Sequence, residues 1–412
     1  MRQPPGFVDP DVPSHVLQID KAVNGVRPGP LWWFKEVSPF IIQSLQYQQS
    51  REDPCLYFKH TSDGLITFTL HVDDLRAYAE PSSLHILDAD LEKLSSKYEL
   101  RFVSPSTHLG MQILDTADHI IIHQQTYITE IITEFLENPK SKYNTPVPNK
   151  LPSEIWEPAT LDDINYMQKI PYNTLIGKLQ YTRTRPDILY AVHILQGFLK
   201  QPKRIHWDLA QRLLGYLNNT SNYGLHFNKH NSNLILNTYA DADFANNPIS
   251  RKSLSGKLIM LNGAPILSSC KYQPTVASST AVAEIIAQNS LAKDNLWIRR
   301  LLAELSIPQP GPTVQHCDNP IASAVGSNVL TRHKTKHIDT VLMSYSEWIE
   351  RGLIRMNKIS DKENVGDIFT KPIPRRKFEF CRLSLGLKPF SSQPDASKHH
   401  EMGGSVCSGI SC

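Results

Sequence analysis

Between residues 66 and 73 apolar and polar side chains alternate strictly, as in a β-strand with one apolar and one polar face. The segment LRAYA at 75–79 follows and predicts the return strand of a hairpin. This pattern places Asp73 on the polar face of the first strand and Asp74 at the turn.

Apolar residues recur at helical spacing between residues 172 and 220, interrupted by Pro and Gly, and predict a small helical unit. From residue 232 onward the pattern predicts strand, hairpin, two helices, strand, helices, strand and helix, in that order. Strands and helices mixed in this way are typical of a layered architecture, so the expected fold class is α/β (mixed α+β).

Three breaks in this pattern suggest domain boundaries. Proline and polar residues cluster at 138–154, a polar segment covers 228–233, and a third break follows TKPIPRR near residue 376. After about residue 390 no periodic apolar positions remain. The sequence therefore predicts domains over 1–145, 146–228 and 229–376, and a largely disordered tail over 377–412.

The composition, with 40% hydrophobic and 20% charged residues in a chain of 412, is that of a folded, water-soluble protein. No secretory signal opens the sequence, and no apolar run reaches the roughly 18 residues that a membrane span requires. We therefore expect an intracellular protein, cytoplasmic or nuclear, with no membrane partner. The six cysteines lack the spacing of a zinc site or a disulfide scaffold, and we expect them to be reduced.

The net charge of +3 does not by itself indicate a nucleic-acid partner, although basic residues cluster at 200–206, 331–337 and 375–382. Runs of this kind are commonly solvated faces. The LWW segment at 31–33 offers rings that can stack on nucleic-acid bases, but burial in a core is the favoured interpretation.

Within the second basic run, His333 and His337 are four residues apart, which on a helix puts both on one face as a possible metal pair. Because Arg332, Lys334 and Lys336 lie among them, a helix start that faces phosphate is favoured over a metal site.

Asp73 and Asp74 at the hairpin tip have two interpretations. Adjacent carboxylates can hold a hard cation such as Mg²⁺, and a two-metal phosphoryl-transfer site normally needs a further acid from another strand. Alternatively the pair is a polar turn, where Asp is common because its side chain bonds nearby backbone amides. Spacing alone favours the turn.

A second group of acids comes from separate predicted elements. Asp241 and Asp243 follow a strand, and Glu284 lies one turn into a helix that Ser279 or Thr280 can cap. Asp318 ends a short strand before a helix start at Asn319 and Pro320, and Asp367 follows the strand LIRMNKI. Any one of these acids alone is better explained as a capping or solvated residue. Four carboxylates from separate elements are, however, what two Mg²⁺ ions need to hydrolyse a phosphodiester.

Motifs along the rest of the chain change which interpretation of these acids is favoured. HVDD resembles the paired-aspartate motif of reverse transcriptases, and the flanking blocks resemble the Ty1/copia class of retrotransposon Pol proteins. The blocks match in the family's order: QPPGFVDPD (3–11), REDPCLYF (51–58), HLGMQI (108–113), LIGKLQYTRTRPDILYAV (175–192) and HWDLAQRLLGYLNNTSNYGL (206–225).

Several positions depart from the family pattern. In the family the third polymerase carboxylate lies on a strand upstream of the QPPGF block, and this chain begins at Met1 inside that block. Asn24 and Pro28 stand where Tyr and Gln are usual, and His71 stands where Tyr is usual. We therefore expect that the polymerase part, with Asp73 and Asp74, does not polymerise on its own.

The second acid group lies in blocks that resemble the Ty1/copia ribonuclease H domain. These blocks are YADADFA, RKSLSG (251–256), TVASSTAVAEIIA (275–287), HCDN, HKTKHID (333–339) and DIFTKP. The resemblance implies that the catalytic, metal-binding positions are Asp241, Glu284, Asp318 and Asp367. Val282 stands where a nearby Glu is usual.

The resemblance implies the C-terminal part of a Pol polyprotein. It would comprise a partial reverse transcriptase fingers and palm (1–145), a helical thumb or connection region (146–228) and an RNase H-like mixed-sheet domain (229–376). The implied cofactor is Mg²⁺ or Mn²⁺, and the implied partners are an RNA/DNA hybrid or DNA and RNA, with Arg332, Lys334, Lys336 and His337 as binding residues. Two alternatives are a non-catalytic nucleic-acid-binding derivative and a decayed copy of the element.

Overall fold

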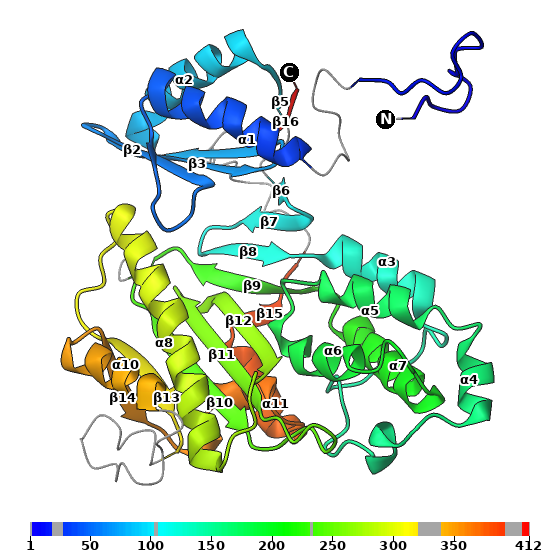
Figure 1. The fold of residues 1–412 in the computed structure, drawn as a ribbon. Helices are drawn as coiled ribbons and strands as arrows, with labels where there is room; N and C mark the ends of the chain where they lie inside the picture. Colours follow the sequence, from blue (N-terminus) through cyan, green and yellow to red (C-terminus); the bar gives the residue numbers. More distant parts are fainter. Residues whose placement is uncertain are drawn as a thin grey trace. The chain divides into compact units, whose positions relative to one another are not determined.

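The computed structural model describes residues 2–18, 28–102, 106–230, 234–319, 339–391 and 406–411 (Figure 1). The chain forms two compact units. Unit 1 consists of Met1–Pro105 with Glu401–Cys412, and unit 2 of Ser106–His400. The boundaries expected at 145, 228 and 376 all fall inside unit 2, so they remain predictions about segments of one packed unit.

Unit 1 contains one antiparallel sheet and two main helices. The helices are α1 (Gly29–Pro39), which continues into a π-helical turn at Phe40–Ser44, and α2 (Leu84–Lys97). The strands are β1 (Gln48–Gln49), β2 (Leu56–Thr61), β3 (Gly64–His71), β4 (Asp74–Ala79), β5 (Glu99–Phe102) and β16 (Val406–Ser411), in the sheet order β1-β2-β3-β4-β16-β5. The C-terminal strand β16 thus pairs with β4 on one side and with β5 on the other.

The predicted hairpin is confirmed as β3 and β4, but its turn is shifted. His71 pairs with Asp74, so Val72 and Asp73 form the turn and Asp74 opens the return strand. The prediction that Asp74 lies at the turn is therefore wrong by one position. Val72 has φ of +56°, a left-handed conformation that is unfavourable for a β-branched residue.

The core of unit 1 lies between its sheet and its helices. Ile66 and Phe68 from β3 pack with Ala77 from β4 and with Leu87 from α2. The LWW segment is divided: Trp33 packs edge-on against Tyr98 at 5.3 Å between ring centroids, whereas Leu31 and Trp32 stay about half exposed. Burial in the core, the favoured interpretation, therefore holds for only one of the three side chains.

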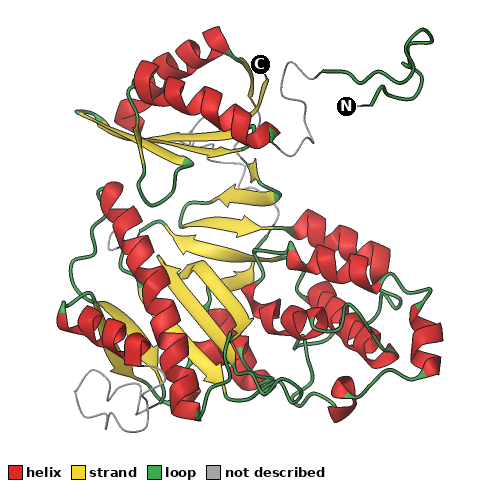
Figure 2. Cartoon of the chain, viewed as in Figure 1, coloured by secondary structure: helices red, strands yellow, loops and turns green. Residues whose placement is uncertain are grey.

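Unit 2 begins with a sheet and a group of helices. The strands β6 (Thr107–His108), β7 (Met111–Asp115), β8 (His119–His123), β9 (Tyr223–Asn228) and β15 (Leu387–Pro389) form a sheet in the order β15-β9-β8-β7-β6. The helices are α3 (Gln125–Phe135), α4 (Leu161–Met167), α5 (Tyr172–Gln180), α6 (Leu189–Gln196) and α7 (Arg204–Asn219), with 3₁₀ turns at Ser153–Trp156 and Pro186–Ile188. Figure 2 shows these helices grouped beside the strands, and the predicted helical unit is thus confirmed.

The second sheet of unit 2 is mixed. Its order is β12 (Ala264–Tyr272), β11 (Leu254–Leu261), β10 (Asn237–Asp243), β13 (Thr313–Cys317) and β14 (Ile354–Lys358). The first three strands pair antiparallel, whereas β10–β13 and β13–β14 pair in parallel. The expected α/β (mixed α+β) class is confirmed.

Hydrophobic clusters cover the two faces of this mixed sheet. Leu258 of β11 belongs to a cluster that includes the α3–α7 helices, whereas its neighbour Ile259 belongs to one with α8 (Thr280–Glu304). Alternate residues of a strand point to opposite faces, so β11 joins both clusters. The α3–α7 helices and the mixed sheet are consequently parts of one unit.

Two expectations about unit 2 are corrected. The two helices expected after the hairpin are one helix of 25 residues, α8, because no Pro or Gly interrupts Thr280–Glu304. Part of the expected tail is folded, since α11 (Arg375–Ser384) and β15 bury Phe378 and Leu387. Among the described residues the remaining helix is α10 (Asp339–Glu350), and 3₁₀ turns lie at Asp361–Glu363 (η7) and Val365–Phe369 (η8).

Among the described residues Cys55, Cys270, Cys317 and Cys381 are free thiols, as expected for these four. None of the helices in the described ranges has the length and apolar character needed to cross a bilayer.

Candidate active site

Asp241 lies on β10, the central strand of the mixed sheet, and is 2% exposed. Asp241 therefore lies inside the strand, whereas the sequence pattern predicted that it follows the end of the strand. Its Oδ1 accepts a hydrogen bond from Asn364 Nδ2 at 3.1 Å, and its Oδ2 accepts one from the hydroxyl of Thr370. Asp243 lies two residues on and accepts from Asn246 Nδ2 at 2.6 Å.

Glu284 is delivered by the first turn and a half of α8. Ser279 caps this helix, as predicted, by accepting a hydrogen bond from the Val282 amide at 3.3 Å. Glu284 is 4% exposed, and its Oε1 accepts from the Ala242 amide at 3.3 Å, whereas Oε2 has no hydrogen-bond partner among the described residues. A buried carboxylate oxygen without a donor indicates a place for a ligand.

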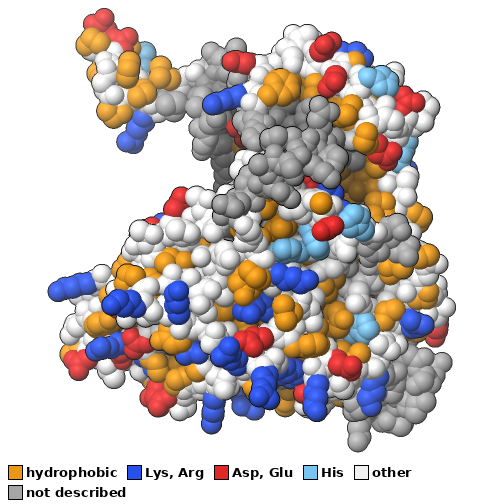
Figure 3. All heavy atoms as spheres, turned by 180° about the vertical axis from the view of Figure 1, so that it is seen from behind, with side chains coloured by type: hydrophobic (Ala, Val, Ile, Leu, Met, Phe, Trp, Pro, Cys, Tyr) orange, Lys and Arg blue, Asp and Glu red, His pale blue; other side chains and the backbone are white. Residues whose placement is uncertain are grey.

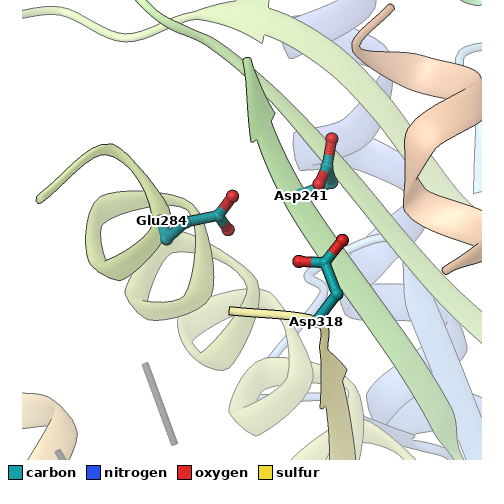
Figure 4. Close-up of side chains that lie close together, drawn as sticks. All are labelled: Asp241, Glu284 and Asp318. Carbon is teal, nitrogen blue, oxygen red and sulfur yellow. The ribbon is translucent and has the colours of Figure 1, made fainter. Parts of the chain in front are cut away.

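Asp318 follows directly after β13 and completes a group of three carboxylates. One oxygen from each of Asp241, Glu284 and Asp318 lies within 4.8 Å of the others. Figure 4 shows the three side chains pointing from β10, α8 and the end of β13 toward a common space.

Asp367, the fourth predicted position, lies next to this group in η8 but faces two lysines. Its Oδ1 is 2.8 Å from Lys371 Nζ, and its Oδ2 contacts Lys377 Nζ from α11. Asp367 also belongs, with Asp318 and Asp361, to a second group of carboxylates spaced closely enough for a cation. The structure therefore gathers all four predicted acids, three around one space and the fourth against lysines.

Burial and mutual repulsion act on these carboxylates. Burial, and then the charge of Asp367, raises the pKa of Asp241 well above its usual value. Burial, followed by the charges of Asp241 and Asp318, raises the pKa of Glu284. Burial alone would lower the pKa of Lys371, but the nearby Asp241 and Asp367 raise it. Burial and repulsion therefore favour either protonation of these acids or a nearby cation over several bare carboxylates.

Sequence reasoning missed the residues that hold these acids together. Asn364, Thr370, Lys371 and Lys377 all bond to the acids, yet none was predicted as a site residue. Asn364 and Lys371 lie in or beside the DIFTKP block, which was the only available signal. Lys377 belongs to the basic run at 375–382 that was interpreted as a solvated face.

Two glycines allow η8 to approach the sheet. Gly256 on β11 pairs with Asp241, and a Cβ placed there would lie 2.7 Å from Phe369 Cβ. A Cβ on Gly366 would lie 3.0 Å from Asp241 Cβ. Only residues without side chains permit this contact, which brings Asp367 beside Asp241.

Asp73 and Asp74 have no comparable surroundings. Asp73 is exposed and Asp74 half-buried at the tip of the hairpin. In the described part of the chain no third metal-ligating side chain joins them at the spacing of a cation site. The strand β16, next to β4, has the sequence VCSGIS and carries no acid.

The basic runs are only partly solvated. Lys203 is 5% exposed and its Nζ donates to the Glu154 carbonyl, and Arg382 Nη1 donates to Tyr216 Oη at 3.3 Å, so these two side chains are bonded within unit 2. On the face of unit 2 seen in Figure 3, basic side chains alternate with acidic and apolar ones. Several predicted positions lie outside the described residues: Asn24, Arg332, His333, Lys334, Lys336 and His337.

Comparison with known proteins gives the following matches. A family model described as reverse transcriptase (RNA-dependent DNA polymerase) matches residues 1–148. A retrovirus-related Pol polyprotein from the Nicotiana tabacum transposon TNT 1-94 is 33% identical over 395 residues, which cover 94% of this chain and 29% of that protein. A putative transposon Ty5-1 protein of Saccharomyces cerevisiae is 30% identical over 290 residues, covering 69% of this chain and 92% of that protein.

The Pol polyprotein from the Arabidopsis thaliana transposon RE1 is 28% identical over 390 residues, 94% of this chain and 26% of that protein. The chain thus spans less than a third of the length of these Pol relatives. Among solved structures, LC11-RNase H1, isolated from compost by a metagenomic approach, matches 33% of this chain and 92% of its own with 15% identity. The TM-score of 0.27 is too low to carry an argument.

Proposed function

This chain belongs to the Ty1/copia-type retrotransposon Pol polyproteins, and from that premise we propose that unit 2 hydrolyses the RNA strand of RNA/DNA hybrids. The observation that carries the proposal is the group formed by the buried Asp241 and Glu284 with the half-buried Asp318, in which one oxygen of each lies within 4.8 Å of the others. Asp367 is proposed as the fourth acid of the same site.

The residues present fit a hard divalent cation, Mg²⁺ or Mn²⁺. All the candidate ligands are carboxylate oxygens, which such ions prefer, and the unpartnered Oε2 of Glu284 is buried beside them. When bound, divalent cations supply an activated water and stabilise the leaving oxygen of a phosphodiester.

The chain's own residues hold and orient the site. The β10 backbone fixes Asp241 at the centre of the sheet, and the capped first turn of α8 fixes Glu284. Lys371 and Lys377 keep Asp367 on the η8 side of the group. Burial of these carboxylates lowers the local dielectric and strengthens every interaction that they make with a cation.

We propose that unit 1 is inactive as a polymerase in this chain. Asp73 and Asp74 supply two carboxylates, whereas a two-metal phosphoryl-transfer site needs another acid to bridge the ions. The expected result is no primer extension by the full chain on an RNA template with Mg²⁺ and deoxynucleotides. Extension that Asp73→Asn abolishes would contradict this part of the proposal.

The proposed nucleic-acid partner is an RNA/DNA hybrid, selected through groove shape and the 2′-hydroxyl and not through base sequence. Arg332, Lys334, Lys336 and His337 remain proposed contacts to its phosphates, and an intracellular location, cytoplasmic or nuclear, remains part of the proposal. Phosphate contacts predict a steep loss of affinity as salt is raised.

The test is cleavage of a labelled RNA/DNA hybrid by the full chain with Mg²⁺, compared with its Asp318→Asn variant. We expect the chain to cut the RNA strand and the variant to be inactive while retaining its fold by circular dichroism. A folded chain that binds the hybrid without cutting it would instead support the non-catalytic binding alternative. A folded chain that neither binds nor cuts would support the decayed copy.

A further inference from the structure

The amide nitrogen of Asn364 lies among three of the site's carboxylates. It donates to Asp241 Oδ1 at 3.1 Å and to Asp318 Oδ2 at 3.1 Å, and Asp367 Oδ1 lies 3.5 Å away. These three acids come from three separate elements, β10, the end of β13 and η8. One uncharged group therefore connects carboxylates that otherwise repel one another.

The orientation of this amide is fixed. Asn364 is fully buried, and its Oδ1 accepts a hydrogen bond from the Gly366 amide at 3.0 Å. Because an oxygen must accept that bond, the NH₂ group has to face the carboxylates. The Asn364 backbone is held as well, since its amide donates to the carbonyl of Asp361 at 3.3 Å.

We propose that Asn364 is a positioning residue that acts as a placeholder for a divalent cation. Its NH₂ group holds Asp241, Asp318 and Asp367 together in the free protein, and a cation bound by Asp241, Glu284 and Asp318 competes with it for the oxygens of Asp241 and Asp318. The inference rests on the proposed function only in that it assumes a cation binds at this site.

The chemistry of the Asn364 amide explains why it stabilises the free site and why a cation can still displace it. Hydrogen bonds to ionised groups are stronger than neutral ones, so the amide stabilises the free site. An amide has only two N–H bonds for three carboxylates and no net charge, and it leaves Oε2 of Glu284 without a donor. A divalent cation neutralises the acids more completely, and so it competes with Asn364 for the same oxygens.

The test uses the full chain, its Asn364→Leu variant and a matched control, Asn295→Leu. Asn295 is a fully buried asparagine of α8, and neither amide atom has a hydrogen-bond partner among the described residues. Two quantities are measured with Mg²⁺ alone: its affinity by isothermal titration calorimetry, and the Tm in EDTA and in MgCl₂.

We expect Asn364→Leu to lower the Tm in EDTA and to bind Mg²⁺ about tenfold more tightly, since the competing amide is gone. The rise in Tm on adding MgCl₂ should be larger than in the unmodified chain. Asn295→Leu should bind Mg²⁺ as the unmodified chain does. Unchanged or weaker Mg²⁺ binding by Asn364→Leu would overturn the proposal.

If Asn364→Leu does not fold, Asn364→Asp replaces it, because it conserves the shape, removes both N–H donors of the amide and adds a negative charge. It should be less stable in EDTA and bind Mg²⁺ more tightly, and weaker binding would again overturn the proposal. The two proposals can be told apart. If the chain binds Mg²⁺ and the variants behave as expected, but the chain does not cut the hybrid, only the RNase H function fails. An unmodified chain that binds no Mg²⁺ overturns both.

Discussion

The two acidic groups of this chain differ in what surrounds them. Asp73 and Asp74 lie next to each other in sequence on one hairpin tip, where Asp73 is exposed. Asp241 and Glu284 lie 2% and 4% exposed and come from a central strand and a long helix of unit 2. The two acids that are neighbours in sequence thus form an open pair, whereas acids far apart in sequence come together in a cluster that is largely buried.

The difference teaches that a cation site depends on the elements that enclose its carboxylates. Unit 1 supplies both acids from one hairpin, and β16, the next strand of the sheet, adds none. In unit 2 strand β10, the end of β13, helix α8 and the turn η8 each supply one acid, and both α8 and η8 pack against β10. If burial among packed elements, and not the number of acids, determines Mg²⁺ binding and cleavage, variants of the two groups should differ as follows.

The largest effect is expected from Asp241→Asn, which removes a central carboxylate. We expect hybrid cleavage to fall by on the order of 10³-fold, because the site would lose an anionic ligand from its centre. Mg²⁺ affinity measured by calorimetry should fall with it.

The matched comparison is the double variant Asp73→Asn and Asp74→Asn, which removes the open pair. Its Mg²⁺ affinity should equal that of the unmodified chain. If the hairpin variant lost Mg²⁺ binding and Asp241→Asn kept it, the contrast between the two groups would be reversed.

Gly256→Ala should produce the second-largest effect, because it removes the space that brings η8 to the sheet. The added Cβ would lie 2.7 Å from Phe369 Cβ, so η8 has to shift. We expect a loss of about 1–3 kcal/mol in the free energy of unfolding and a 10- to 100-fold loss of cleavage.

Gly177→Ala on α5 provides the control, since a Cβ at that position meets nothing within 4 Å. It should leave cleavage unaltered and raise stability slightly, because alanine favours a helix. Equal losses from both glycine variants would show that close packing of η8 is irrelevant to the site.

The scaffold of the buried group should also be sensitive to acid through His206. Burial lowers the pKa of His206 to about 4, from an ordinary value of 6.5. Its Nδ1 accepts the Lys203 amide at 2.9 Å, so Nε2 carries the proton that bonds the Ile155 carbonyl at 2.9 Å. Protonation of Nδ1 would break the hydrogen bond from the Lys203 amide.

Because the folded pKa is below the unfolded one, the unfolded chain binds more protons between pH 6.5 and pH 4. His206 should therefore contribute full stability above pH 6.5 and lose up to about 3 kcal/mol as the pH falls to 4. Denaturant unfolding across this range checks it. His206→Gln should reduce the acid dependence by this share, since His123 and His193, whose pKa values burial also lowers, keep theirs. Substitution of the exposed His230 should leave the acid dependence unaltered.

The smallest effect is expected at the hairpin tip. Val72 has φ of +56°, which glycine adopts without strain. Val72→Gly should stabilise unit 1 by less than about 1 kcal/mol, since relief of strain is partly offset by greater freedom of the unfolded chain. A lowered stability in urea unfolding would show that the side chain of Val72 has a packing role that its exposure does not suggest.

Local patterns in the sequence were sufficient for the elements that carry the acids. Strict alternation predicted the β3–β4 hairpin, and the Ser279 cap placed Glu284 near the start of a helix, because both signals are contained in a few consecutive residues. The order of strands and helices after residue 232 predicted a layered α/β (mixed α+β) architecture for the same reason.

Local patterns failed where an outcome depended on contacts along the rest of the chain. The 377–391 segment was predicted as part of the tail because a break near residue 376 precedes it, yet Phe378 and Leu387 are buried against distant elements. Lys377 belonged to a basic run that resembled a solvated face, and only the fold places it on Asp367.

The sequence by itself determined which residues are acids, which elements carry them and that these elements form a mixed α/β chain. The tertiary structure decided that Asp241 and Asn364, 123 positions apart, are joined by a hydrogen bond, that lysines face Asp367 and that β16 lies beside β4. The physical reason is that side-chain periodicity reports only the burial of a residue's own element. The distance between two elements follows from how they pack, and here glycines on β11 and in η8 set it.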